Sequence, residues 1–335
     1  MEKYVREEIK KLAAYEVLNK DFAIKLDANE GVEWITGLNR YPLDKSDILR
    51  GELAKQLGKD KDEIVLGNGS SELIELAMKA YLEAGETVVS FSPTFSMYQI
   101  FTIIHKGNYE EYPLEDKKKL NIEGFIDFIQ EKKAKLVIIS NPNNPTGLFI
   151  PREEIKKILT SVDAMVILDE AYIEFTNEPK IDFTEEFKNM LILRTFSKAM
   201  GLAGIRLGYM IADKESIRYI NRVRSPYNVN TLTQEMGLKV LSDQESINKN
   251  SEMIKKEREK MKLFLQENDL NPFPSEANFL FFQAPKAVFD ALENKAVLIR
   301  NFSGKLEGYY RLTIGTPQEN DSVRKIIKEA QHATS

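Results

Sequence analysis

The chain has 335 residues and a formal net charge of -5, and 42% of its residues are hydrophobic and 30% charged. This is the composition of an ordinary globular protein, and the negative charge argues against bulk binding of nucleic acid. No apolar run is long enough to span a bilayer and the N-terminus has no apolar signal core, so we expect a cytoplasmic protein without membrane partners. The absence of cysteine excludes disulfides and thiolate catalysis, and two histidines are too few for a histidine-rich metal site, so we expect no metal.

Short apolar runs alternate with amphipathic helical patterns over the first two thirds of the chain. We expect strands at 64–68, 87–91, 136–140, 165–170, 191–197 and 207–212. Helical patterns lie between several of them, at 71–85, 122–135 and 151–162. This alternation predicts an α/β fold with a mostly parallel central sheet and helices on both faces. The last two strands are joined by too little helix for a crossover, so we expect one of them to pair antiparallel.

The alternation stops near residue 225. A long charged helical pattern follows at 247–268, and we interpret its charges as a solvated helix face. Shorter strands are expected at 278–283, 296–300 and 309–315. We therefore expect a large domain over 31–228 and a smaller α+β domain over 229–335. The N-terminal segment, 1–30, has no sheet signal and is expected to pack on the small domain.

The stretch GNGSSELIELAMKAYL begins at Gly67, directly after an expected strand. Ser70 or Ser71 could cap the following helix, whose free N–H groups and dipole would suit a phosphate. Glu72 occupies the third glycine position of G-x-G-x-x-G, so the stretch is not a dinucleotide fingerprint. A plain strand–turn–helix connection remains the alternative.

Two motifs follow later strands of the expected sheet. NPNNPTG (141–147) forms a rigid turn at a strand's carboxyl end, where open α/β sheets hold ligands, although it could also be structural. LDEAY (168–172) ends another strand, and its neighbours Asp169 and Glu170 should point to opposite faces. One of the two carboxylates, with Tyr172, could face the ligand crevice.

Aromatic and basic residues complete the set of strand-end motifs. Phe95 and Tyr98 in SFSPTFSMYQIF offer rings on which a flat cofactor could stack, or they form an aromatic core patch. Lys198 lies among small residues in RTFSKAMGLAGIRLGY and could act as an amine nucleophile and base. Arg206, eight residues later, could neutralise a phosphate. A lysine amine, a carboxylate and a phosphate site are what pyridoxal 5'-phosphate (PLP) requires.

The motifs D-E-A-Y, S-K-x-x-x-L-A-G-x-R-x-G-Y and N-P-N-N-P-T-G together resemble the fold-type I, PLP-dependent aminotransferases. Within them, the closest resemblance is to the histidinol-phosphate aminotransferases, from LDANE near residue 26 to YYRLTIGT near 316. The resemblance implies that Lys198 forms the Schiff base with PLP and that Asp169 pairs with the ring nitrogen. It also implies that Asn144 and Tyr172 bind the phenolic oxygen and that Tyr98 stacks on the ring.

The same resemblance implies further contacts to cofactor and substrate. The phosphate would be held by Gly69, Ser70, Ser71, Thr195 and Arg206. Tyr41 would reach the cofactor phosphate of a neighbouring subunit, which implies a homodimer with shared active sites. The substrate would be bound by Arg311 and Arg300 as anion sites and by the N-terminal residues Tyr15 and Asn29.

The implied reaction is reversible transamination between L-histidinol phosphate and 2-oxoglutarate, giving imidazole acetol phosphate and L-glutamate in L-histidine biosynthesis. Two related activities remain open: a threonine-phosphate decarboxylase of corrinoid synthesis, and an aminotransferase for aromatic amino acids. A non-catalytic PLP-binding protein or regulator is the alternative from another class, and the filled lysine position argues against it.

Overall fold

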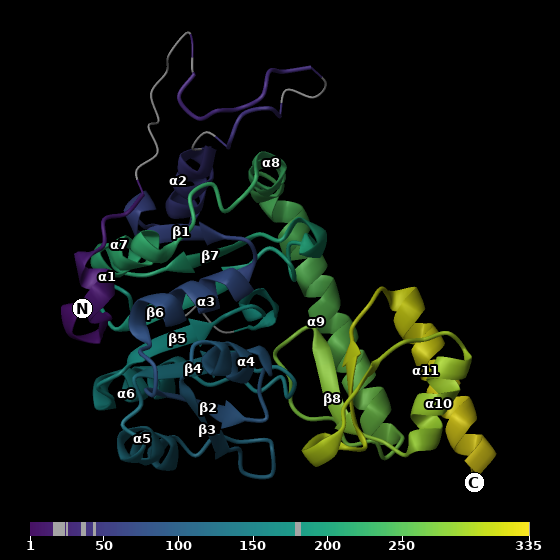
Figure 1. Cartoon of the computed structure of the whole chain (residues 1–335). Helices are drawn as coiled ribbons and strands as arrows, with labels where there is room; N and C mark the ends of the chain where they lie inside the picture. Colours follow the sequence, from purple (N-terminus) through teal and green to yellow (C-terminus); the bar gives the residue numbers. More distant parts are fainter. Residues whose placement is uncertain (16–23, 25, 35–37, 43–44, 178–181, 335) are drawn as a thin grey trace.

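The computed structural model describes residues 1–334, apart from 16–23, 25, 35–37, 43–44 and 178–181. The described residues form a seven-stranded sheet and a separate three-stranded sheet, with the long helix α9 (Gln244–Glu267) running between them (Figure 1). None of the described helices is both long enough and apolar enough to cross a membrane.

The larger sheet has the strand order β1-β7-β6-β5-β4-β2-β3. Its strands are β1 (Ile64–Gly67), β2 (Thr87–Ser92), β3 (Asn108–Pro113), β4 (Leu136–Ser140), β5 (Met165–Asp169), β6 (Met190–Thr195) and β7 (Gly208–Ile211). The strands from β2 to β6 pair in parallel, whereas β7 is antiparallel to both β6 and β1. The fold class is thus confirmed, as is the antiparallel strand expected near the end of the sheet.

Helices cover both faces of this sheet because its central strands are apolar on both sides. Along β4, Val137 and Ile139 enter one core, which also contains residues of α2, α5 and α6, while Leu136 and Ile138 enter the other, with residues of α3 and α7. The helices around the sheet are α1 (Glu7–Lys11), α2 (Lys45–Leu57), α3 (Ser70–Tyr81), α4 (Met97–Ile104), α5 (Ile122–Glu131), α6 (Arg152–Ser161), α7 (Lys214–Val223) and α8 (Thr231–Leu241).

The three-stranded sheet has the order β8-β10-β9 and is antiparallel throughout. It consists of β8 (Phe279–Gln283), β9 (Arg300–Asn301) and β10 (Tyr309–Thr313), and it packs with α9, α10 (Lys286–Asn294) and α11 (Pro317–Thr334) (Figure 1). The strand expected at 296–300 is largely wrong, since only Arg300 and Asn301 pair with β10.

Strand β3 was not expected from the sequence. It lies at the edge of the larger sheet and pairs in parallel with β2, and most of its residues are partly or fully exposed. An edge strand with little buried surface needs no continuous apolar run, so NYEEYP gives no strand signal of the kind on which the other assignments depended.

The start of the chain packs on the larger sheet, which contradicts the expected packing of the N-terminal segment on the small domain. Val5 and Ile9 are buried in the same core as α3 and α7. The Arg222 guanidinium of α7 donates to the Ile9 carbonyl at 3.1 Å, and the Arg6 N–H donates to the Ala80 carbonyl at 3.0 Å. The early apolar residues therefore complete a core that the sequence pattern alone did not assign to them.

Helix α8 also belongs to the larger body rather than to the small domain. Val229, just before the helix, and Leu241, at its end, are buried in the core that contains α2 and the sheet. The Thr233 hydroxyl donates to the Ile205 carbonyl at 2.8 Å. We therefore propose a domain division near the start of α9 instead of at residue 229.

Candidate active site

A pocket of about 560 Å³ lies at the carboxyl ends of the parallel strands, where it also meets the small domain. Strand-end segments of the larger body supply most of its wall, and Arg300, Phe302, Leu306 and Arg311 supply the rest. The predicted residues that line it are Ser70, Ser71, Tyr98, Asn144, Asp169, Tyr172, Thr195, Lys198, Arg206, Arg300 and Arg311. Parallel strands place their following loops at one edge, which is why motifs far apart in sequence meet here.

Asp169 is the buried carboxylate of the pocket. It ends β5, and its Oδ2 accepts a hydrogen bond of 2.7 Å from the Tyr98 hydroxyl, while Oδ1 accepts one of 3.1 Å from the Ala171 N–H. Burial raises the pKa of Asp169, and the Tyr98 hydrogen bond, the Ala171 N–H and the charge of Lys198 oppose that shift. Asp169 is thus a desolvated carboxylate that gains from a cationic partner in the pocket.

The neighbouring carboxylate, Glu170, points the other way, as the alternation of a strand requires. Its Oε2 accepts from Arg194 Nε at 2.8 Å and lies 2.7 Å from Arg194 Nη2, and both side chains are almost completely buried. This ion pair joins the ends of β5 and β6 behind the pocket. The prediction that the two carboxylates point to opposite sides, with only one of them facing the pocket, is therefore confirmed.

Tyr98 makes a hydrogen bond that the sequence did not predict. Its side chain is completely buried, its hydroxyl binds Asp169, and its ring meets Phe95 edge-to-face at 5.5 Å between centroids. Phe95 is only partly buried and also lines the pocket. Phe95 is thus the more exposed of the two rings that line the pocket, and Tyr98 holds the Asp169 carboxylate through its hydroxyl; the stacking of Tyr98 on a cofactor ring stays a prediction.

Lys198 reaches the pocket from the loop after β6. Its Nζ lies 5.4 Å from the centroid of the Tyr172 ring. Partial burial lowers the pKa of the Lys198 ammonium, the positive charges of Arg311 and Arg206 lower it further, and Asp169 opposes them. A lysine with a lowered pKa has more of its amine in the neutral, nucleophilic form.

The turn between β1 and α3 is the segment that the sequence predicts to hold a phosphate, and we call it the cradle. Gly69 has φ +79°, and a Cβ there would lie 2.5 Å from Arg206 Nη2, so only glycine lets the guanidinium come so close. Gly69 also precedes α3 without any side-chain cap, so the expected N-cap role of Ser70 or Ser71 is wrong. Both serines instead line the pocket beside the free N–H groups at the helix start.

The loop after β6 completes this cradle. Arg206 adopts a left-handed backbone conformation, and its Nη1 donates to the Ser197 hydroxyl and to the Ala203 carbonyl, each at 3.3 Å. Thr195 lines the pocket, and its hydroxyl accepts from the Ser197 N–H at 3.1 Å. One guanidinium, four hydroxyl-bearing side chains (Ser70, Ser71, Thr195 and Ser197) and a helix N-terminus have the chemistry that a phosphate monoester requires.

The remaining wall of the pocket is formed where the two domains meet. Arg311 on β10 donates to Asn144 Oδ1, and its guanidinium lies 5.2 Å from the centroid of the Phe279 ring. Tyr172 packs edge-to-face on the same Phe279 ring at 5.1 Å, and burial raises the pKa of Tyr172 to about 12. Arg300, on β9, lines the pocket as a second cation of the small domain.

Four predicted residues are not among those that line this pocket: Gly69, which precedes the lining residue Ser70, and the N-terminal residues Tyr41, Asn29 and Tyr15. The ring of Tyr41 stacks on Tyr227 with centroids 4.6 Å apart, and Asn29 lies in the same separate surface hollow as Tyr41. Tyr15 is 70% exposed and lines another hollow with Tyr227. The described residues 26–34 and 38–42 lie above α2 and α8 in Figure 1.

Comparison with known proteins identifies the family. A model of the aminotransferase class I and II family matches residues 11–327. Two curated relatives are histidinol-phosphate aminotransferases: that of Pyrococcus furiosus is 40% identical over 96% of this chain and 97% of its own. That of Caldanaerobacter subterraneus subsp. tengcongensis is 36% identical over 98% of this chain and 99% of its own. The chain belongs to the class I and II aminotransferases.

A solved structure shows the same fold with the cofactor in place. It is the histidinol-phosphate aminotransferase of Sinorhizobium meliloti in complex with PLP, which superposes with a TM-score of 0.83 over 89% of this chain and 84% of its own at 24% identity. PLP is the cofactor of the family, and the pocket fits it: a desolvated carboxylate, a lysine of lowered pKa and a glycine-walled phosphate cradle lie together.

Proposed function

We propose that the protein is a histidinol-phosphate aminotransferase, which interconverts L-histidinol phosphate and 2-oxoglutarate with imidazole acetol phosphate and L-glutamate in L-histidine biosynthesis. The observation that carries the proposal is the full-length identity of 36–40% to enzymes of that name. The pocket supports it, because Arg300 and Arg311 of the small domain line it and can bind both a carboxylate and a phosphate ester.

PLP, when bound, supplies the electron sink that makes the Cα proton of an amino substrate acidic. Lys198 Nζ is the group that links to the cofactor, and its lowered pKa suits it to accept and return the Cα proton as an amine. The Asp169 carboxylate, fixed by the Tyr98 hydroxyl and the Ala171 N–H, would keep a proton on the ring nitrogen.

Two further residues would bind the phenolic oxygen of the cofactor. With a pKa of about 12, the Tyr172 hydroxyl stays protonated near neutral pH and can donate a hydrogen bond. The side-chain oxygen of Asn144 accepts a hydrogen bond from Arg311. The residue that would bind the cofactor and the arginine that would bind substrate are therefore in direct contact. Phe95, partly exposed to the pocket, offers its ring for stacking.

A homodimer with shared active sites is the second part of the proposal. Tyr41 is half exposed and far from its own chain's cradle, and Leu26, Val32 and Trp34 are at least 84% exposed. Large apolar side chains in one segment favour coverage by a second copy, which would bring Tyr41 to the neighbour's phosphate cradle. The cytoplasmic location stays a prediction.

Subunit complementation tests the shared site. Lys198→Ala and Tyr41→Ala variants are each expected to be nearly inactive, whereas their refolded or exchanged mixture should regain activity. A mixed dimer contains one site with the lysine of one chain and the tyrosine of the other. A mixture no more active than the sum of its parts, or a fully active monomer in light scattering, would refute the shared site.

Substrate competition tests the reaction. The PLP-loaded protein is given L-histidinol phosphate with 2-oxoglutarate, and L-glutamate is measured; separate reactions contain L-threonine phosphate, with release of carbon dioxide measured, and L-phenylalanine as donor. Preferential glutamate formation from histidinol phosphate supports the proposal. Carbon dioxide from threonine phosphate would identify the decarboxylase instead, and preference for phenylalanine an aromatic aminotransferase. Lys198→Ala is the control for activity at this site.

A further inference from the structure

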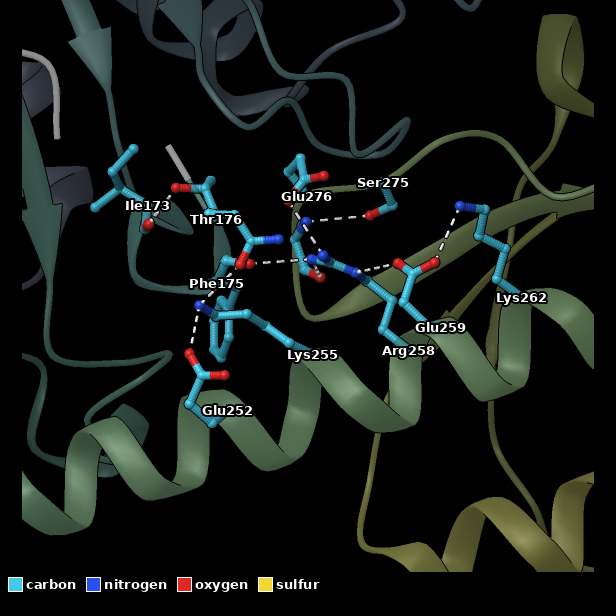
Figure 2. A network of polar contacts seen from close by, with 12 residues as sticks. Ile173, Phe175, Thr176, Glu252, Lys255, Arg258, Glu259, Lys262, Ser275 and Glu276 are labelled. Carbon is cyan, nitrogen blue, oxygen red and sulfur yellow. Dashed lines mark hydrogen bonds and ion pairs between the residues drawn. The ribbon is translucent and has the colours of Figure 1, made fainter. Parts of the chain in front are cut away.

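The largest fully buried side chain among the described residues belongs to Arg258 of α9, within the run of charges expected to face solvent. Its Nη1 donates to the Phe175 carbonyl at 3.1 Å and to the Ala277 carbonyl at 3.0 Å, and its Nη2 donates to Glu276 Oε2 at 3.1 Å. Figure 2 shows this guanidinium between the turn at Ile173–Phe175 and the segment around Ser275 and Glu276. One side chain thus joins three segments that lie far apart in sequence.

Burial makes these contacts costly to lose. A guanidinium stays protonated in proteins, so its burial requires hydrogen-bond acceptors around it. Arg258 has two main-chain carbonyls and two carboxylates as acceptors, since Glu259 also accepts from its Nε at 3.5 Å. The carbonyls of Phe175 and Ala277 share one of its nitrogen atoms. Without the guanidinium, two carbonyls at the domain boundary would lose this partner.

On the side of the larger body, the contact reaches Tyr172. The short helix η3 (Ile173–Phe175) follows that residue directly, and the Phe175 N–H donates to the Tyr172 carbonyl at 3.1 Å. Because Arg258 binds the Phe175 carbonyl, it fixes the far end of the turn that begins at the pocket.

On the small-domain side, the contact reaches Arg311. Ala277 lies two residues before β8, whose Phe279 packs on Tyr172 and lies under the Arg311 guanidinium. Strand β8 pairs with β10 so that Phe281 is opposite Arg311. The Glu276 N–H also donates to the Gly147 carbonyl at 3.0 Å, which ties the same segment to the loop that carries Asn144.

We propose that Arg258 is a positioning residue for substrate binding: it holds the segment 275–279 against the turn after Tyr172 and thereby sets the position of Arg311 in the pocket. This inference rests on the proposed aminotransferase function. It assigns a functional consequence to a buried charge that touches neither cofactor nor substrate.

The test compares Arg258→Met and Arg258→Lys with wild type. In Arg258→Met, the KM values of the amino donor and of 2-oxoglutarate should both rise about tenfold, as expected for loss of a buried hydrogen-bonded contact, while kcat changes less. Arg258→Lys keeps the charge but not the fork of donors, so its KM values should fall between those of wild type and Arg258→Met. Hydrogen exchange of the Glu276 amide, measured in the PLP-free protein, should be slowest in wild type, intermediate in Arg258→Lys and fastest in Arg258→Met.

Lys255→Met is the matched control. Lys255 lies one turn earlier on α9 and binds Asn177 at 3.2 Å and Glu252 at 2.6 Å, but none of these contacts involves 275–277. Its KM values and Glu276 exchange should stay within about twofold of wild type; changes equal to those of Arg258→Met would overturn the proposal.

The outcomes separate the two hypotheses. If the wild-type protein catalyses no transamination, the proposed function is refuted. If the wild-type protein is active but both Arg258 variants keep its KM values and its Glu276 exchange rate, only the positioning role is refuted. If Arg258→Met does not fold, Arg258→Lys decides the matter by the same two measurements: values above wild type support the role, and wild-type values overturn it.

Discussion

Replacing Tyr98 by Phe removes one hydroxyl and keeps the ring. That hydroxyl is completely buried and donates to Asp169 Oδ2 at 2.7 Å. A buried hydrogen bond to a charged acceptor contributes about 1.5–3 kcal/mol, which corresponds to a factor of about 10 to 100 in an equilibrium constant. Its loss also raises the pKa of Asp169 further, because this bond is the strongest influence that opposes the burial effect.

The expected result is weaker PLP binding and slower turnover in Tyr98→Phe, each by about 10- to 100-fold at neutral pH. The sign of the pH dependence follows from the raised pKa: Asp169 destabilises the PLP-free fold above its pKa and ceases to do so as it becomes protonated. The stability lost in Tyr98→Phe should therefore be largest at pH 8 and should shrink as the pH falls. PLP titration, steady-state kinetics and urea unfolding at several pH values measure these effects.

Tyr81→Phe is the control, because the Tyr81 hydroxyl is also buried but makes only a 3.4 Å contact with the Ser216 carbonyl, on α7. It should leave PLP affinity and turnover near wild type. The same experiment decides between stacking and hydrogen bonding: if Tyr98 contributed only its ring, Tyr98→Phe would be silent. Wild-type affinity and turnover in Tyr98→Phe would refute the reasoning.

Three other predictions follow from the same contacts. Arg311→Met should move the pH midpoint of PLP capture by Lys198 upward, because the charge of Arg311 lowers that lysine's pKa; Arg300→Met should shift it less, and a downward shift would contradict the argument. Glu170→Gln should destabilise the protein by about 3–5 kcal/mol in urea unfolding, since it leaves the Arg194 charge buried, whereas replacing both residues by methionine should cost less; equal losses would show that the pair itself stabilises. Lys198→Ala should abolish turnover in the glutamate assay while PLP still binds through the cradle, and measurable turnover would exclude Lys198 as the linking amine.

The sheet and the cofactor side of the pocket could be predicted because their signals are local. Each central strand is a continuous apolar run that ends at or shortly before a residue of the pocket: Asp169 is the last residue of β5, and Lys198 lies three residues after β6. Parallel pairing then brings these ends together without further information from the sequence. The contact between Tyr98 and Asp169 could not be predicted in this way, because it joins a residue of α4 to the end of β5 across 71 residues of the chain.

Arg258 shows why a buried charge escapes prediction. On α9 it lies among lysines and glutamates, and a pattern of charges at helical spacing normally marks a solvated face. Inside the protein, its guanidinium binds the carbonyl groups of Phe175 and Ala277, which lie 83 and 19 residues away in the chain. No local feature of the sequence specifies those acceptors, so only the assembled domains reveal that this arginine belongs to the interior.

The N-terminal residues are a different case, because their proposed partner is a second copy of the chain. Tyr41 and Tyr15 are exposed in the single chain, and Tyr41 rests on Tyr227 rather than on any cradle. If the neighbour's pocket is their destination, the ring contact with Tyr227 must break on association, so removal of that ring should favour the dimer or leave it unchanged. Tyr227→Ala, examined by sedimentation over a range of concentrations, tests this. A weaker dimer would mean that Tyr227 holds Tyr41 in the position used for association.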